Sequence, residues 1–195
     1  PEGGGAWNFI KKLTASGSGD LSFVDGTDDV VLDSTYKTYV FTFNNMHPET
    51  NSVAFHFNLS IDSGSNYNVT KTTTYVTAYH DEANTSTNLG FDSGLSQAQS
   101  TGYQTIATPV GNGNDECVSG YLHLFDPSST TFVKHFICTS NVYHASNYTV
   151  NTHMAGYGNT TSAVDAINFQ MSADNIDAGD ICLYGISSWV VLFHK

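Results

Sequence analysis

The chain contains no arginine, and its cations are six lysines set against 18 acidic residues. Charged residues occupy 12% of its 195 positions, about half the share of about 25% found in an average globular protein. Phosphate recognition depends on arginine forks and basic patches. The net charge of −12 therefore argues against binding to nucleic acid and to anionic membranes.

Long hydrophobic runs are also missing. The longest apolar run covers residues 189–193, which is far too short to span a bilayer. Residues 1–5 have neither the basic region nor the apolar region of a signal peptide. We therefore expect a soluble protein without membrane insertion, in which residues 1–5 form a flexible or partner-bound tail and residues 6–195 form one domain.

Cysteine is scarce, with Cys117, Cys138 and Cys182 far apart in the chain. Their number is odd and none belongs to a CxxC pair, so neither a disulfide framework nor a zinc knuckle is predicted. We expect buried thiols that act as small hydrophobic side chains. A disulfide between two of them stays an open alternative.

Signals for β-strands dominate the rest of the sequence, which holds 12 Phe and 11 Tyr. Runs rich in Val, Ile, Thr, Tyr and Phe alternate with period two and end at clusters of Gly, Asn, Asp and Ser. This pattern predicts an all-β, antiparallel β-sandwich that is jelly-roll-like. Residues 83–99 are polar and predict a long loop with one helical turn. The predicted strands cover residues 7–13, 21–24, 39–43, 53–60, 69–79, 103–108, 118–125, 132–138, 148–155, 166–171, 181–186 and 189–194.

Eight histidines raise the question of a metal site. The densest cluster is His80-Asp81-Glu82, but no HExxH motif is present, so no metal site is predicted. His123 and His135 are interpreted as residues of a polar strand face or as hydrogen-bonded core residues. Two loops, residues 25–29 and 112–116, are rich in oxygen ligands but lack EF-hand spacing. They are interpreted as solvated turns, with a structural calcium ion as an open alternative.

No catalytic motif is found. The GxSxG elbow, the phosphate loop and the dinucleotide glycine pattern are all missing from the sequence. Glycosidases need two carboxylates that flank the substrate bond, and no strand places two carboxylates together on one face. We therefore predict that the protein is not an enzyme and has no catalytic residues and no cofactor.

Seven segments stand out, in order along most of the chain: Gly5-Ala6-Trp7-Asn8-Phe9-Ile10-Lys11, Asn45-Met46-His47-Pro48, Ala78-Tyr79-His80-Asp81-Glu82-Ala83, Gly120-Tyr121-Leu122-His123-Leu124-Phe125, residues 127–136, Ala155-Gly156-Tyr157-Gly158-Asn159-Thr160-Thr161 and residues 175–186. Together they resemble a family of marine bacteriophage virion structural proteins, which are cyanophage- and pelagiphage-like. The resemblance implies a virion component of the tail, fibre or particle-surface type, without established catalytic residues.

The predicted function is that of a non-enzymatic virion structural protein, either capsid decoration or a tail or fibre component. Its partners would be itself, as a homo-oligomer with the trimer favoured, and other virion proteins. Residues 187–195 extend past the resemblance and are expected to add an edge strand or to pair with a neighbouring subunit. The predicted assembly interface in this segment consists of Trp189, Val190, Val191, Leu192 and Phe193.

The alternative function is a carbohydrate-binding, lectin-like module with a host-surface glycan as its partner. Sugars stack on exposed Trp and Tyr rings. The sequence does not show whether Trp7 and Trp189 share a surface, and core packing is the more ordinary role for most aromatic residues.

Overall fold

The computed structural model describes residues 6–187, which form twelve β-strands and no helix within that range. The predicted all-β antiparallel fold is confirmed. No element of residues 6–187 has the helical length and apolar character needed to cross a membrane. The predicted tail at residues 1–5 and the predicted assembly interface at residues 189–193 lie outside the described residues.

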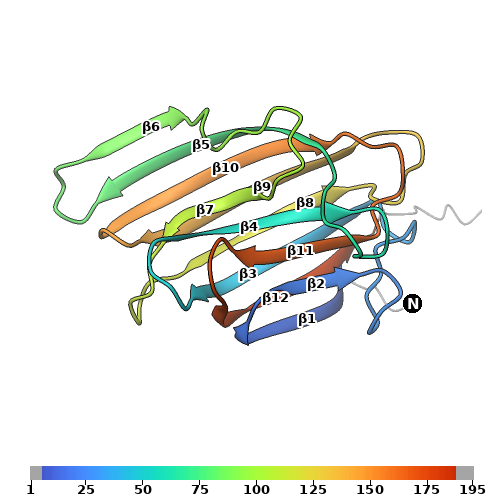
Figure 1. The fold of residues 1–195 in the computed structure, drawn as a ribbon, viewed down its shortest axis with the longest axis horizontal. Helices are drawn as coiled ribbons and strands as arrows, with labels where there is room; N and C mark the ends of the chain where they lie inside the picture. Colours follow the sequence, from blue (N-terminus) through green and yellow to red (C-terminus); the bar gives the residue numbers. More distant parts are fainter. Residues whose placement is uncertain (1–5, 188–195) are drawn as a thin grey trace, which may run out of the picture.

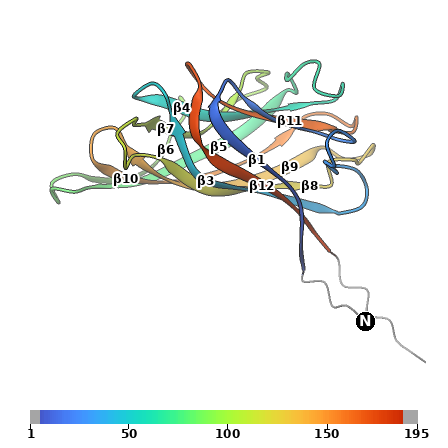
Figure 2. The same cartoon turned by 90° about the horizontal axis from the view of Figure 1, so that it is seen from below.

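The strands form two layers (Figure 1; Figure 2). The large sheet has the order β1 (Trp7–Ser18), β12 (Ile176–Ile186), β3 (Thr38–Pro48), β8 (Val118–Phe125), β9 (Lys134–His144), β10 (Tyr148–Gly158), β5 (Lys71–Asp81) and β6 (Thr87–Phe91). The small sheet has the order β7 (Gln104–Val110), β4 (Val53–Ser60), β11 (Ala166–Met171) and β2 (Leu21–Val24). Between the two sheets, one residue pair, Val110 with His144, joins β7 to β9.

The core lies between the two sheets and is built from aromatic side chains. In β3 the alternating residues Tyr39, Phe41 and Phe43 are fully buried, as the period-two pattern predicts. Phe169 of β11 lies at the centre of the cluster. Its ring centroid is 5.3–6.3 Å from those of five other phenylalanines, which are Phe23, Phe41, Phe43, Phe55 and Phe57.

Two buried lysines interrupt this apolar interior. Lys71 and Lys134 are both fully buried and face each other across Gly158 of β10, with which each pairs. The Lys71 Nζ donates hydrogen bonds to the side-chain oxygen of Asn58 and to the Val69 carbonyl, the latter at 2.9 Å. The Lys134 Nζ donates to two backbone carbonyls at 2.7 and 3.2 Å. Burial lowers the pKa of Lys71 to about 7 because the charged form loses its hydration.

One segment departs from the sequence prediction. Residues 83–99 were expected to form a loop with one helical turn, but they contain strand β6, and the structure shows no helix there. Among the strands that the structure describes, β6 pairs only with β5, and four of its five residues are exposed. Leu89 and Phe91 alternate with Asn88 and Gly90 in this strand, but the run is only five residues long and includes Asn and Gly, which strands disfavour.

Candidate functional site

The outer face of the large sheet is the side that points away from the small sheet. The strand register aligns its side chains in rows that cross the sheet. One row runs from β1 to β5 through Phe9, Tyr184, Val40, His123, Ile137, Ala155 and Thr74. The row beside it consists of Trp7, Ile186, Thr38 and Phe125, followed by His135, Tyr157 and Thr72.

We call these two rows the aromatic face. They contain no Asp, Glu or Lys, although the chain has 18 acidic residues. Three large apolar side chains of this face are about half exposed: Phe9 at 60%, Trp7 at 51% and Ile137 at 49%. Exposed apolar side chains that gather in one patch mark interaction surfaces, whereas scattered ones do not.

The rings of the aromatic face pack edge-on against each other. Trp7 and Tyr184 have centroids 5.5 Å apart and planes inclined at 68°, and Phe9 meets the same tyrosine at 5.8 Å and 71°. Trp7 also meets His123 at 87°. Partial burial lowers the pKa of His123, because the neutral imidazole is favoured where water is excluded.

A shallow groove of about 460 Å³ lies in the aromatic face over β8, β9, β10 and β5. Phe125, Ile137 and Tyr157 contribute most of its large side chains, and Gly156 lies in the strand that crosses it. The groove and the exposed residues of β1 belong to the same two rows, so they form one continuous surface.

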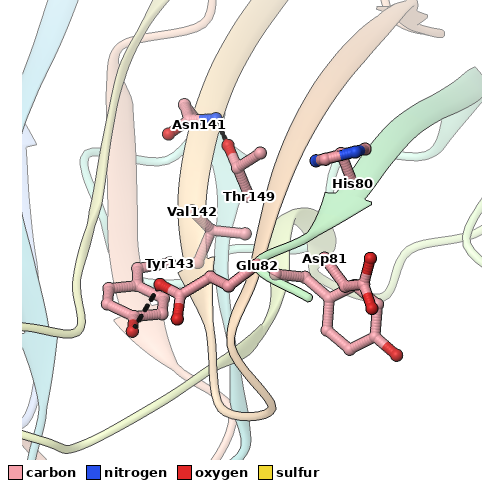
Figure 3. Close-up of a pocket in the computed structure, with 8 residues that line it drawn as sticks. His80, Asp81, Glu82, Asn141, Val142, Tyr143 and Thr149 are labelled. Atoms are coloured by element: carbon pink, nitrogen blue, oxygen red, sulfur yellow. Dashed lines mark hydrogen bonds between the residues drawn. The ribbon is translucent and has the colours of Figure 1, made fainter. Parts of the chain in front are cut away.

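A polar pocket occupies the opposite end of β5, β9 and β10, with a volume of about 310 Å³ (Figure 3). The Tyr143 hydroxyl donates a hydrogen bond to the Glu82 carboxylate at 3.0 Å, and this bond raises the pKa of the tyrosine. The Asn141 amide donates to the Thr149 hydroxyl at 2.8 Å. His80 lies apart from these pairs in Figure 3, and its Nε2 is 3.0 Å from the side-chain oxygen of Asn84.

The sequence cluster His80-Asp81-Glu82 therefore does not converge on one point. Successive side chains of a strand point to opposite faces, so Asp81 points away from His80. Asp81 accepts hydrogen bonds from the backbone N–H groups of Thr85 and Ser86, both at 2.8 Å, and from the Thr85 hydroxyl. The Thr85 hydroxyl and these N–H groups hold the pKa of Asp81 below its usual value. Within residues 6–187 no group of three or more metal-ligating side chains is found.

The oxygen-rich loops use their carboxylates to hold their own turns. Asp25 accepts a hydrogen bond from the Leu32 N–H at 2.8 Å, and Glu116 accepts one from the Gly113 N–H at 2.6 Å. These contacts agree with the interpretation of the two loops as turns. His123 and His135, which were interpreted as residues of a polar strand face or of the core, both lie on the outer face of the large sheet.

All three cysteines are free thiols. Cys138 is buried, as expected, whereas Cys117 and Cys182 are half-buried. Burial raises the pKa of Cys138, which keeps this thiol protonated and unreactive.

Sequence reasoning missed the aromatic face, although one signal for it was present. In β8 the large residues Tyr121, His123 and Phe125 alternate with Leu122 and Leu124. A strand that is apolar on both faces indicates that both faces are covered. The polar pocket left no such signal, because its residues come from three strands.

Comparison of the chain with protein-family models, with curated proteins and with solved structures finds no match in any of the three.

Proposed function

We propose that the protein is a non-enzymatic structural component of a virus particle, which acts by self-association and by docking on other particle proteins. In this proposal the aromatic face is the surface that a neighbouring copy of the chain covers. The oligomer is closed, with the trimer as the leading stoichiometry. The resemblance to marine phage virion proteins supports the location on a particle.

The observation that carries the proposal is the absence of charge from the aromatic face of a chain with a net charge of −12. Two copies of so acidic a protein repel each other, and this repulsion is weakest where the contact surface is free of carboxylates. Interface cores are depleted of charged residues and enriched in Trp, Tyr and Phe. Trp7, Phe9 and Tyr184 match that composition at the β1 end of the face.

The ring geometry favours a protein partner over a sugar on this face. A sugar ring stacks on the flat side of an aromatic ring, and an extended glycan needs several such sides in one plane. The planes of Trp7 and of Phe9 are instead each inclined to the plane of Tyr184 by about 70°. An uneven surface of ring edges and faces suits side chains of a second protein, which interdigitate with it.

The edge of the large sheet supports contact through the face. Edge strands avoid pairing with other chains through bulges and charged side chains. The β1 edge strand has a register shift between Phe9 and Lys11 and carries two consecutive lysines, Lys11 and Lys12. These features discourage edge-to-edge pairing along β1 and leave the face as the contact surface.

The strongly perturbed titratable groups support a non-enzymatic role. Burial lowers the pKa of His56 to about 4 and raises that of Tyr75 to about 12. Neither residue lines the groove or the polar pocket, and neither does Lys71. A catalytic site would place perturbed groups where a ligand reaches them.

The solution mass of the purified chain, measured by light scattering behind a sizing column, tests the proposal. We expect a stable oligomer for the wild type. Ile137→Asp places a carboxylate at the centre of the aromatic face and should give a monomer. Ile61→Asp is the matched control, because this isoleucine is 43% exposed and lies in the turn after β4. A wild-type monomer at high concentration, or an Ile137→Asp variant with unchanged mass, would contradict the proposal.

A further inference from the structure

We infer that the polar pocket at the ends of β5, β9 and β10 is a binding site for a neutral saccharide, with room for one or two sugar rings. The inference goes beyond the proposed function and does not rest on it, because the pocket lies outside the aromatic face. Its volume of about 310 Å³ is at the lower end of the range for small-ligand sites.

The side chains that line the pocket have hydrogen-bonding capacity beyond the contacts they make with each other. Glu82 receives the Tyr143 hydroxyl on one carboxylate oxygen, which leaves the other oxygen as an acceptor. Asn141 uses its amide nitrogen for Thr149 and keeps its amide oxygen as an acceptor. Thr149 accepts that bond and keeps its hydroxyl proton as a donor. Adjacent hydroxyls of a sugar both donate and accept, so they match this set of groups.

The two internal hydrogen bonds also hold the pocket ready for a ligand. The Glu82 carboxylate is fixed by Tyr143, and Asn141 is fixed by Thr149, at 3.0 and 2.8 Å (Figure 3). A group that is already ordered loses little conformational freedom on binding. The half-buried ring of Tyr143 supplies apolar surface on which the carbon-bound hydrogens of a sugar pack, whereas the ring of Tyr148, which also lines the pocket, packs against Tyr79.

The charge of the pocket selects the class of sugar. Among residues 6–187 no lysine lines it, and the chain has no arginine, so the pocket holds no permanent cation to neutralise a carboxylate, sulfate or phosphate. Glu82 would repel such a group. A neutral hexose or disaccharide meets no such penalty.

The position of the pocket suits a particle protein. It lies at the far end of the same strands that carry the groove, so it is separate from the two rows that a neighbour covers in the proposed assembly. One sheet can therefore present an assembly surface and a sugar site side by side.

The test is a nuclear magnetic resonance titration of the isotope-labelled full chain, with methyl glycosides of neutral hexoses and with maltose, cellobiose and lactose as probes. N-acetylneuraminic acid serves as the anionic probe. We expect at least one neutral probe to shift the amide signals of His80, Asn141, Tyr143 and Thr149. We expect the anionic probe to bind more weakly than that neutral sugar.

Two threonines of the outer face provide a matched pair of variants. Thr149→Ala removes the hydroxyl that can donate to a sugar and that accepts the hydrogen bond from Asn141. This variant should bind the sugar about tenfold more weakly. Thr74→Ala changes the same side chain in β5 outside the pocket and should leave binding unchanged. Tyr143→Phe removes only the hydroxyl that fixes Glu82 and should also weaken binding while the fold is kept.

Three results would overturn the inference: no neutral probe binds, the shifts map to other residues, or Thr149→Ala and Thr74→Ala bind equally well. None of these results bears on self-association, which the solution mass measures separately.

Discussion

Lys71 leads to a prediction about how stability depends on pH. Its ammonium group is fully buried and has only neutral acceptors, Asn58 and the Val69 carbonyl. The pKa is 10.5 for an ordinary lysine and about 7 for Lys71 in the folded chain. At about 1.4 kcal/mol per pH unit, this difference means that the buried, charged lysine destabilises the folded state by about 5 kcal/mol.

The sign follows from proton binding. Between about pH 7 and about pH 10.5 the unfolded chain holds a proton on Lys71 that the folded chain has released, so stability rises with pH in this window. Below about pH 7 both states are protonated, and the contribution of this group no longer changes. The expected slope is about 1.4 kcal/mol per pH unit.

Urea unfolding curves at a series of pH values, measured for the wild type and for Lys71→Met, isolate this contribution. Other titrating groups affect both proteins alike and cancel in the difference. From about pH 7 to about pH 10 the free energy of unfolding of the wild type, relative to the variant, should rise by about 4 kcal/mol. Lys37→Met is the control, because the Lys37 side chain is 67% exposed, and its profile should run parallel to the wild type. Parallel profiles for wild type and Lys71→Met would refute the reasoning.

Two further predictions concern the core and the C-terminal segment. Phe169→Ala removes the ring at the centre of the aromatic core and should lower the free energy of unfolding by about 3–5 kcal/mol in a denaturant titration; a loss below about 1 kcal/mol would contradict the assigned packing. Deletion of residues 188–195 removes the predicted assembly interface at residues 189–193 but keeps Ser187, whose N–H donates to the Ala6 carbonyl at 2.9 Å. The shortened chain should form a weaker oligomer in a sizing experiment, and an unchanged oligomer would contradict a role of this segment in assembly.

Much of the fold could be predicted because its strands carry their own signal. Tyr39, Phe41 and Phe43 alternate with smaller residues, and the sheet that they enter buries one face of that alternation. The β6 strand could not be predicted. It forms on the free edge of β5, and the alternation of Leu89 and Phe91 with Asn88 and Gly90 is too short to predict a strand by itself.

The candidate sites were harder to predict than the strands. His80-Asp81-Glu82 drew attention as a cluster because its residues are consecutive, but alternation along the strand separates them. The polar pocket instead joins Glu82 to Tyr143, which are 61 positions apart in the chain. Such a meeting depends on β10 lying between β5 and β9, and no local pattern encodes that strand order.

Composition and periodicity alone determined that this chain is acidic, free of arginine and built of antiparallel strands. These properties depend on residue types and on neighbours along the chain. Only the tertiary structure decided that Phe9 and Ile137 lie in one row, since that row needs the register of every strand pair between β1 and β9. Register is a long-range property, and a slip of one residue in any pair would turn that strand's side chains to the opposite face.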